Sequence, residues 1–85
     1  TTRSVKFKET ANVLPCPKCG NKTEFTIRSE RAAEDCCDVY AECKCGNAPP
    51  SDEAFEDVLG GCHDENVIAA ISCWNDWVLN LVVSE

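Results

Sequence analysis

The sequence predicts a small α+β domain, in which a β-hairpin carrying two cysteine knuckles packs against a C-terminal α-helix. Two short motifs, CPKCG at 16–20 and CKCG at 43–46, both end in Cys-Gly. The segment 22–29 between them alternates apolar and polar residues as a half-buried strand does. The segment 65–83 is long and apolar with helical spacing.

The chain is short, and its 85 residues make one domain, 1–85. A chain of this length buries only about 60–65% of its unfolded surface on folding. Small domains therefore usually add disulfides, a metal or a partner chain. The eight cysteines supply that addition. They are read as disulfides in a secreted chain, and as metal ligands or redox thiols in a cytosolic one.

The N-terminal stretch TTRSVKFKETAN has no apolar run that could serve as the core of a signal peptide, although a mature secreted form would look the same. No apolar stretch approaches the roughly 20 residues of a membrane span. We expect a soluble cytoplasmic protein with no membrane association.

Charge is distributed unevenly along the chain, whose net charge is −7. The first 45 residues hold all eight basic residues and seven acids, a net of +1. Residues 46–85 hold eight acids and no base, a net of −8. Such a half repels phosphate backbones and attracts a basic partner surface. This argues against general nucleic-acid binding.

The first half is expected to form the hairpin. Residues 1–12 should be extended and partly mobile, with Val5 and Phe7 alternating as in an edge strand. The strand at 22–29 should be followed by a turn or short helical bend at 30–37, and 38–43 should form the return strand.

The second half is expected to be helical. Ala48-Pro49-Pro50 should end the sheet, because successive prolines cannot continue a central strand. A short helix should start at the N-cap Ser51 and end at Gly60-Gly61, with an apolar face. That face would be made by Phe55, Val58 and Leu59.

The long helix should start at the N-cap Asp64. The stripe expected to face the core consists of Val67, Ile71, Trp74, Val78 and Leu81, widened by Trp77. Ile68, Leu79 and Val83 form a second stripe. A helix this apolar exceeds what one internal face needs, so we expect its remaining apolar side to meet a partner or a second copy, as a homodimer.

The paired cysteines favour one structural zinc ion bound by Cys16, Cys19, Cys43 and Cys45. Zinc prefers four tetrahedral ligands, and thiolates suit it well. The glycine after each knuckle accepts a positive φ, which lets backbone N–H groups point at the sulfurs. The hairpin with its two knuckles would then be a zinc ribbon. A disulfide framework and a redox Cys-x-x-Cys are the alternatives.

Four cysteines remain outside this set. Cys62-His63 could join Cys36 or Cys37 as a second metal site, although free cysteines commonly act as small buried apolar groups. His63 could also act as a base beside a cysteine, but no orienting third group can be named. Cys73 lies in the middle of the predicted helix and should serve packing.

The order LPCPKCG, hairpin, CKCG and AISCWNDW resembles the Lar-like restriction-alleviation family, which are small phage and prophage zinc-ribbon proteins. Pro15 to Gly20 match the first knuckle of that family, and Cys45 and Gly46 match the end of the second. The helix motif Ala-Ile-x-x-Trp-Asn is matched by Ala70, Ile71, Trp74 and Asn75. The second knuckle is shorter here, and Asp76-Trp77 replaces a basic residue that often follows Trp-Asn.

The resemblance implies a non-catalytic phage-type protein that binds and modulates a host protein with a basic surface, counteracting a restriction or other defence system. The expected partner-binding residues are the acids Asp52, Glu53, Glu56 and Asp57 and the apolar Trp77, Leu79 and Val83. The alternative is a nucleic-acid-binding or transcription-modulating ribbon that uses Lys18, Lys22, Arg28 and Lys44. Four thiolates would leave the zinc ion no coordination position for a water molecule, so we expect that the protein is not an enzyme.

Overall fold

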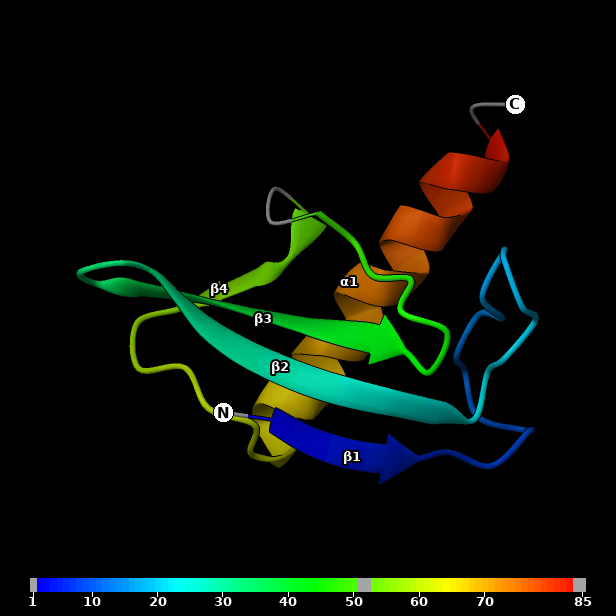
Figure 1. Cartoon of the computed structure of the whole chain (residues 1–85), viewed down its shortest axis with the longest axis horizontal. Helices are drawn as coiled ribbons and strands as arrows, with labels where there is room; N and C mark the ends of the chain where they lie inside the picture. Colours follow the sequence, from blue (N-terminus) through cyan, green and yellow to red (C-terminus); the bar gives the residue numbers. More distant parts are fainter. Residues whose placement is uncertain (1, 51–52, 84–85) are drawn as a thin grey trace.

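A computed structural model describes residues 2–50 and 53–83, except for the side chains of residues 82 and 83. It confirms the small α+β class: four antiparallel strands in one sheet, and a single long helix in the described part of the chain (Figure 1). The elements are β1 (Thr2–Lys6), β2 (Glu24–Ala33), β3 (Cys36–Cys43), β4 (Phe55–Asp57) and α1 (Asp64–Val83).

The sheet has the order β1-β2-β3-β4, so that the predicted hairpin, β2 with β3, lies at its centre. The edge strand expected near Val5 is confirmed as β1, whose Val5 lies opposite Phe25 of β2. Phe25 in turn lies opposite Cys43 of β3. The first residues of β2 and the last of β3 are therefore neighbours, which places the two cysteine motifs at one end of the sheet.

The helical bend considered for 30–37 is wrong, whereas the turn considered for the same segment is present but confined to residues 34–35. β2 continues to Ala33 and β3 begins at Cys36, with a register shift between Arg31 and Ala33. The sequence ERAAEDCC has helix-forming residues, but each residue added to the hairpin gains ladder hydrogen bonds with its neighbour strand. Pairing across the hairpin therefore overrides the local preference.

The short helix predicted after Pro50 is also wrong, and its proposed N-cap Ser51 lies outside the described residues. Phe55–Asp57 forms the edge strand β4, in which Phe55 lies opposite Val39 of β3. The apolar side chains expected on one helix face do not share a buried face: Val58 is 67% and Leu59 is 91% exposed. β4 pairs with the outer edge of β3. A helix here would have left the backbone hydrogen-bonding groups of that edge unpaired.

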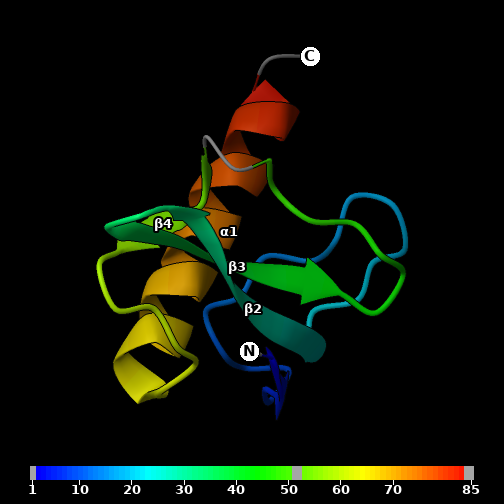
Figure 2. The same cartoon turned by 60° about the vertical axis from the view of Figure 1, so that its left-hand side comes forward.

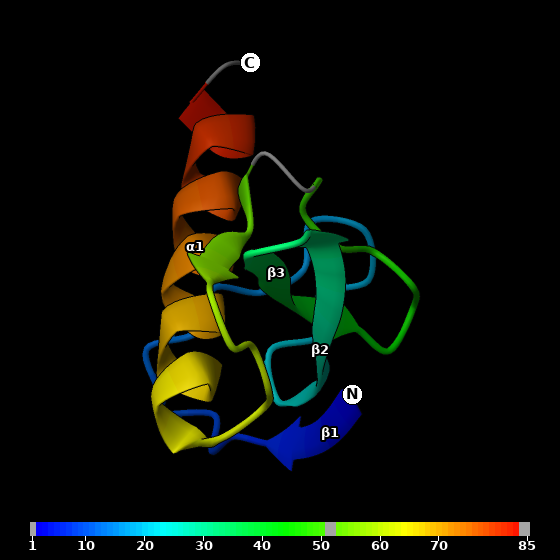
Figure 3. The same cartoon turned by 90° about the vertical axis from the view of Figure 1, so that its left-hand side faces the viewer.

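The helix α1 covers one face of the sheet, which makes two layers (Figure 3). Side chains alternate along β2 and β3, so Phe25, Ile27, Val39 and Ala41 face the helix and are buried. Trp74 is fully buried against them, with its ring centroid 5.0 Å from that of Phe25 in an edge-to-face arrangement. The core therefore lies between α1 and the central hairpin.

Most of the predicted helix stripe is confirmed. Val67, Ile71, Trp74 and Val78 are buried, whereas Leu81 is 38% exposed and does not belong to the core. The last turns of α1 run beyond the sheet (Figures 1 and 2). No helix in the described part of the chain is long and apolar enough to cross a membrane.

The N-cap of α1 lies one residue earlier than predicted. The carbonyl of His63 accepts the first helical hydrogen bond, from Val67 N at 2.9 Å, so Asp64 is the first residue inside the helix. There the Asp64 carboxylate lies 2.8 Å from Arg3 Nη1 of β1. A negative charge in the first turn also interacts favourably with the helix dipole.

The neighbours Trp74 and Asn75 connect α1 to the loop that precedes the first cysteine motif. Trp74 Nε1 donates to the Leu14 carbonyl at 2.9 Å. The Asn75 side chain accepts from Leu14 N and donates to the Asn12 carbonyl, both at 2.8 Å. The structure shows that its bonds fix the path of residues 12–14 toward Cys16.

We expect Asn75→Ala to lower the free energy of unfolding by about 1–3 kcal/mol, because the part-buried Leu14 N–H loses its partner. Denaturant titration followed by circular dichroism measures this. Ser72→Ala, at an exposed position of the same helix, is the control and should stay within about 0.5 kcal/mol of wild type. Equal effects of the two substitutions would contradict the anchoring role.

Candidate metal centre

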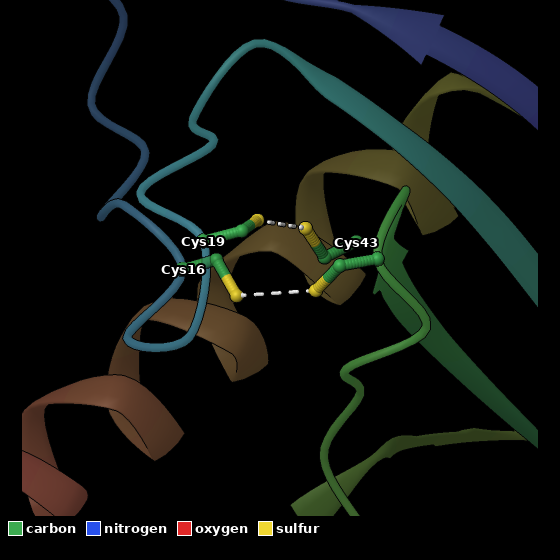
Figure 4. Close-up of side chains that lie close together, drawn as sticks. Cys16, Cys19 and Cys43 are labelled. Atoms are coloured by element: carbon green, nitrogen blue, oxygen red, sulfur yellow. Dashed lines mark hydrogen bonds between the residues drawn. The ribbon is translucent and has the colours of Figure 1, made fainter.

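The four predicted ligands come together at the end of the sheet where β2 begins and β3 ends. Cys16 and Cys19 lie in the loop that leads from β1 to β2, and Cys43 is the last residue of β3. Cys45 follows two residues later. In Figure 4 the sulfurs of Cys16 and Cys19 point across a narrow gap toward those of the second knuckle.

The spacing of the sulfurs fits a single ion. All four Sγ atoms lie within 4.8 Å of one another. Cys16 Sγ lies 3.7 Å from Cys45 Sγ, and Cys19 Sγ lies 3.3 Å from Cys43 Sγ. Tetrahedral metal–sulfur bonds of about 2.3 Å place sulfurs about 3.8 Å apart. The four cysteines could therefore hold one metal ion with only small adjustments.

Disulfides do not compete for these sulfurs, because all eight cysteines are free. A disulfide needs sulfurs about 2.05 Å apart, far closer than either contact in the cluster. The framework of disulfides that the sequence left open is therefore absent from the structure.

Both knuckles close with a glycine of positive φ, as predicted: 77° at Gly20 and 94° at Gly46. Gly20 N donates to the Cys16 carbonyl, and Gly46 N donates to the Cys43 carbonyl, both at 2.8 Å. The second turn is one residue shorter than the first, yet it closes in the same way. A side chain at these φ values would be strained, which explains the repeated Cys-Gly.

The thiols of the cluster differ in proton affinity. Burial raises the pKa of Cys16, but hydrogen bonds from the Asn47 side chain and from the Cys19 and Lys18 backbone outweigh it, and the pKa falls to about 6. The Asn21 backbone lowers the pKa of Cys19, whereas the neighbouring thiols, Cys43 foremost, and burial raise it to about 12. The neighbouring thiols thus oppose ionisation of Cys19, and a cation placed among the sulfurs would displace its proton.

A lysine precedes the second cysteine of each knuckle and could offset the charge of a four-thiolate centre. Lys18 and Lys44 are both exposed. Lys44 Nζ lies 3.1 Å from Glu24 Oε2, and this contact raises the Lys44 pKa. The positive charge of Lys44 is therefore shared between Glu24 and the sulfurs of Cys19 and Cys43.

No group of potential ligands joins Cys62 or His63 to Cys36 or Cys37 among the residues that the structure describes. Cys36 and Cys37 are adjacent in β3 and so point to opposite faces of the sheet. Cys62 Sγ donates to the Ile27 carbonyl at 3.4 Å, and His63 joins no group of potential ligands among the described residues. The side chain of Cys73 is half-buried, and burial raises its pKa.

A different group lies on the open face of the sheet, where Cys36 meets two carboxylates. Cys36, Asp38 and Glu56 each place one potential ligand atom within 4.8 Å of the others. The sequence signal is the alternation of Cys36 and Asp38 in β3. The third member could not be seen because Glu56 was assigned to a helix; in β4 it lies opposite Asp38. Burial and the two carboxylates raise the pKa of Cys36.

The structure describes the side chains of five of the seven predicted partner-binding residues. Asp52 and the Val83 side chain lie outside what the structure describes. Glu53 and Glu56 are exposed, but the half-buried Asp57 accepts a hydrogen bond from Gly60 N at 2.7 Å. Trp77 is half-buried and packs edge-to-face on Trp74, with centroids 5.5 Å apart. Asp57 and Trp77 therefore both make contacts within the fold, and their role in partner binding stays a prediction.

Leu79 remains as an exposed candidate, because 51% of its surface is accessible. It lines an apolar groove of about 410 Å³ between α1 and the first knuckle. A second hollow, which includes Lys22, adjoins this groove along Leu14 and Pro15. The groove is lined by Leu14, Pro15, Cys16, Pro17, Gly20, Val78 and Leu79.

Two residues of the centre were missed in the sequence. Asn21 Nδ2 lies 3.2 Å from Cys43 Sγ, and Asn47 Nδ2 lies 3.4 Å from Cys16 Sγ. Each follows a Cys-Gly pair, so the repeated motif is Cys-Gly-Asn and not only Cys-Gly. That repeat was the available signal.

Comparisons with family models, with curated proteins and with solved structures found no match to this chain. The resemblance to the Lar-like family therefore stays a prediction. What the structure supports is a small α+β fold with a four-cysteine centre, consistent with a zinc-ribbon-like fold.

Proposed function

We propose that this protein is a non-catalytic zinc ribbon that binds another protein through the groove beside its first knuckle. The observation that supports this proposal most directly is the groove itself, which has a volume of about 410 Å³. Its walls are formed by the first cysteine knuckle and by α1. Zinc suits the four sulfurs best, because thiolate ligands and tetrahedral geometry are what it prefers. Cys16, Cys19, Cys43 and Cys45 would hold it, and the ion would fix the knuckle wall of the groove.

A closed set of four thiolates supports a structural role for the ion over a catalytic one. Structural zinc sites use four protein ligands, whereas catalytic sites keep one position for water or substrate. The groove has the composition of a recognition surface, with proline, leucine and valine side chains on its walls. Apolar surface left exposed in this way is typical of an interaction site.

The target class follows from the sequence resemblance and from charge. A Lar-like protein would act on a host restriction or other defence protein. The exposed acids Glu53 and Glu56, within a half that carries −8, would favour a target with a basic surface. The groove would supply the apolar anchor, and the acids would steer association.

The nucleic-acid alternative gains no support from the arrangement of the basic residues. Two of its four proposed contacts are neutralised by neighbours: Arg28 Nε lies 3.2 Å from Glu42 Oε1, and Lys44 pairs with Glu24. Phosphate contacts need cations that are free to release counterions. We therefore propose that the binding partner is a protein and not a nucleic acid.

The test uses immobilised protein, a host lysate and then a purified target such as a restriction enzyme. We expect Leu79→Glu to weaken target binding roughly tenfold or more, because a buried leucine contributes about 1.5–3 kcal/mol. Ile68→Glu is the matched control: Ile68 is also on α1 and is 71% exposed, but does not line the groove.

Glu53→Gln with Glu56→Gln should slow association at low salt and leave dissociation nearly unchanged. The groove assignment would be contradicted if Leu79→Glu left the affinity for the target unchanged, or if Ile68→Glu lowered it as much. Inhibition of DNA cleavage by the purified restriction enzyme then tests whether the bound target is a defence protein.

A further inference from the structure

The two knuckles share a third feature beyond their cysteines and glycines. Each Cys-Gly is followed by an asparagine, Asn21 in the first knuckle and Asn47 in the second. The asparagine carbonyl closes its own turn: Cys16 N donates to the Asn21 carbonyl and Cys43 N donates to the Asn47 carbonyl, both at 2.8 Å. The backbone roles of the two residues are therefore the same, although the turns differ in length.

Their side chains, in contrast, cross to the opposite knuckle. Asn21 Nδ2 lies 3.2 Å from the sulfur of Cys43, and Asn47 Nδ2 lies 3.4 Å from the sulfur of Cys16. Both distances are within the range for an N–H group that donates to sulfur. The amide of each knuckle thus contacts the first cysteine of the other.

Burial explains why these two sulfurs receive the amides. Cys16 is 3% and Cys43 is 2% exposed, so water cannot hydrogen-bond to their sulfurs. Cys19 and Cys45 are exposed and can be solvated. A buried sulfur that carries negative charge needs a donor from the protein, because burial without a partner is costly.

The side chain of Asn21 is itself held in place. Its Oδ1 accepts from Thr23 N at 3.3 Å and from Glu24 N at 3.1 Å, and its Nδ2 also donates to the Glu24 carbonyl at 2.6 Å. The amide is thereby oriented from the first residue of β2 before any ion binds. Such outer partners fix the orientation of metal ligands and tune their charge.

We propose that Asn21 and Asn47 form a reciprocal clasp, a pair of positioning residues that hold the two knuckles in register for metal binding. Each amide also stabilises the negative charge of a buried sulfur in the opposite knuckle. The clasp rests on the proposed metal site. It adds that the affinity of this site depends on two residues that bind no metal themselves.

The test measures metal affinity in three variants of the full chain, by competition of zinc with a chromophoric chelator. Asn21→Asp keeps an acceptor for Thr23 N and Glu24 N but replaces the donor by a carboxylate. Asn47→Ala removes the other donor. Each should weaken zinc binding about 10–100-fold. Asn12→Asp changes the charge at an exposed loop position and should leave the affinity unchanged.

The absorption spectrum of the cobalt(II) form gives a second readout, which would not change if the asparagines had a purely structural role. Loss of an N–H···S bond makes the sulfur more electron-rich, so the sulfur-to-cobalt charge-transfer band should shift to lower energy in Asn47→Ala. The band of Asn12→Asp should match that of wild type. Circular dichroism at saturating metal should be the same for all four proteins.

The outcomes separate the clasp from the metal site. A wild-type chain that binds no zinc or cobalt overturns the proposed function itself. A wild-type chain that binds one ion, with affinity and spectrum unchanged in Asn21→Asp and Asn47→Ala, overturns only the clasp. A variant that fails to regain wild-type circular dichroism at saturating metal also overturns it, because that asparagine would then be a folding residue.

Discussion

Removal of the metal by a strong chelator is expected to unfold the cysteine end of the protein and to lower its thermal midpoint sharply. Folding and metal binding are coupled in small zinc domains, in which binding contributes about 10–16 kcal/mol. A whole domain is stable by only about 5–15 kcal/mol. If an ion holds the four sulfurs, which lie within 4.8 Å of one another, its removal takes away the bonds that join the two knuckles.

The measurement is circular dichroism with thermal melting, before and after chelation and after zinc is returned. Cys43→Ser should reproduce the chelated state, because Cys43 is a buried member of the cluster. Cys62→Ser is the matched control: Cys62 lies outside the cluster, and serine can keep the hydrogen bond to the Ile27 carbonyl. Chelation that moves neither the spectrum nor the midpoint would contradict the metal-dependent fold.

Trp74→Ala is expected to have the largest effect of any substitution outside the metal centre, a loss of about 3–5 kcal/mol. Trp74 is fully buried, contacts the Phe25 ring and donates a hydrogen bond to the Leu14 carbonyl. Its loss would leave a large cavity and release the loop that leads to Cys16. A loss of this size approaches the whole stability of a small domain.

Two further variants separate these contributions in denaturant titrations of the metal-loaded protein. Trp74→Phe keeps most of the ring but leaves the Leu14 carbonyl without its donor, at a cost of about 1–3 kcal/mol. Trp77→Ala removes a half-buried indole from the same helix and should cost less than Trp74→Ala. If Trp77→Ala proves the more damaging, the assignment of Trp74 as the central core residue is wrong.

The sequence was informative where local chemistry decides the structure. Cys-Gly needs a positive φ and closes a tight turn around a sulfur, so both knuckles could be placed from spacing alone. The long helix was equally accessible, because the spacing of Val67, Ile71, Trp74 and Val78 puts them on one face whatever they pack against.

The errors arose where distant partners decide the structure. Phe55, Val58 and Leu59 have the spacing of a helix face. Residues 55–57 instead form a strand, because they pair with the otherwise unpaired edge of β3. Leu81 continues the buried stripe in sequence, yet it is 38% exposed. The contact of the Asn21 amide with the sulfur of Cys43, 22 residues away, likewise depends on a distant partner.

Native mass spectrometry of the freshly purified protein tests the central claim most directly. One zinc ion bound by four thiolates predicts a mass equal to that of the fully reduced chain plus one zinc ion, less the protons displaced from the thiols. The peak should revert to the reduced apo mass on acid denaturation, and Cys43→Ser should lack it. A folded chain without metal, or a mass lowered by about two hydrogens for each linked cysteine pair, would contradict the account.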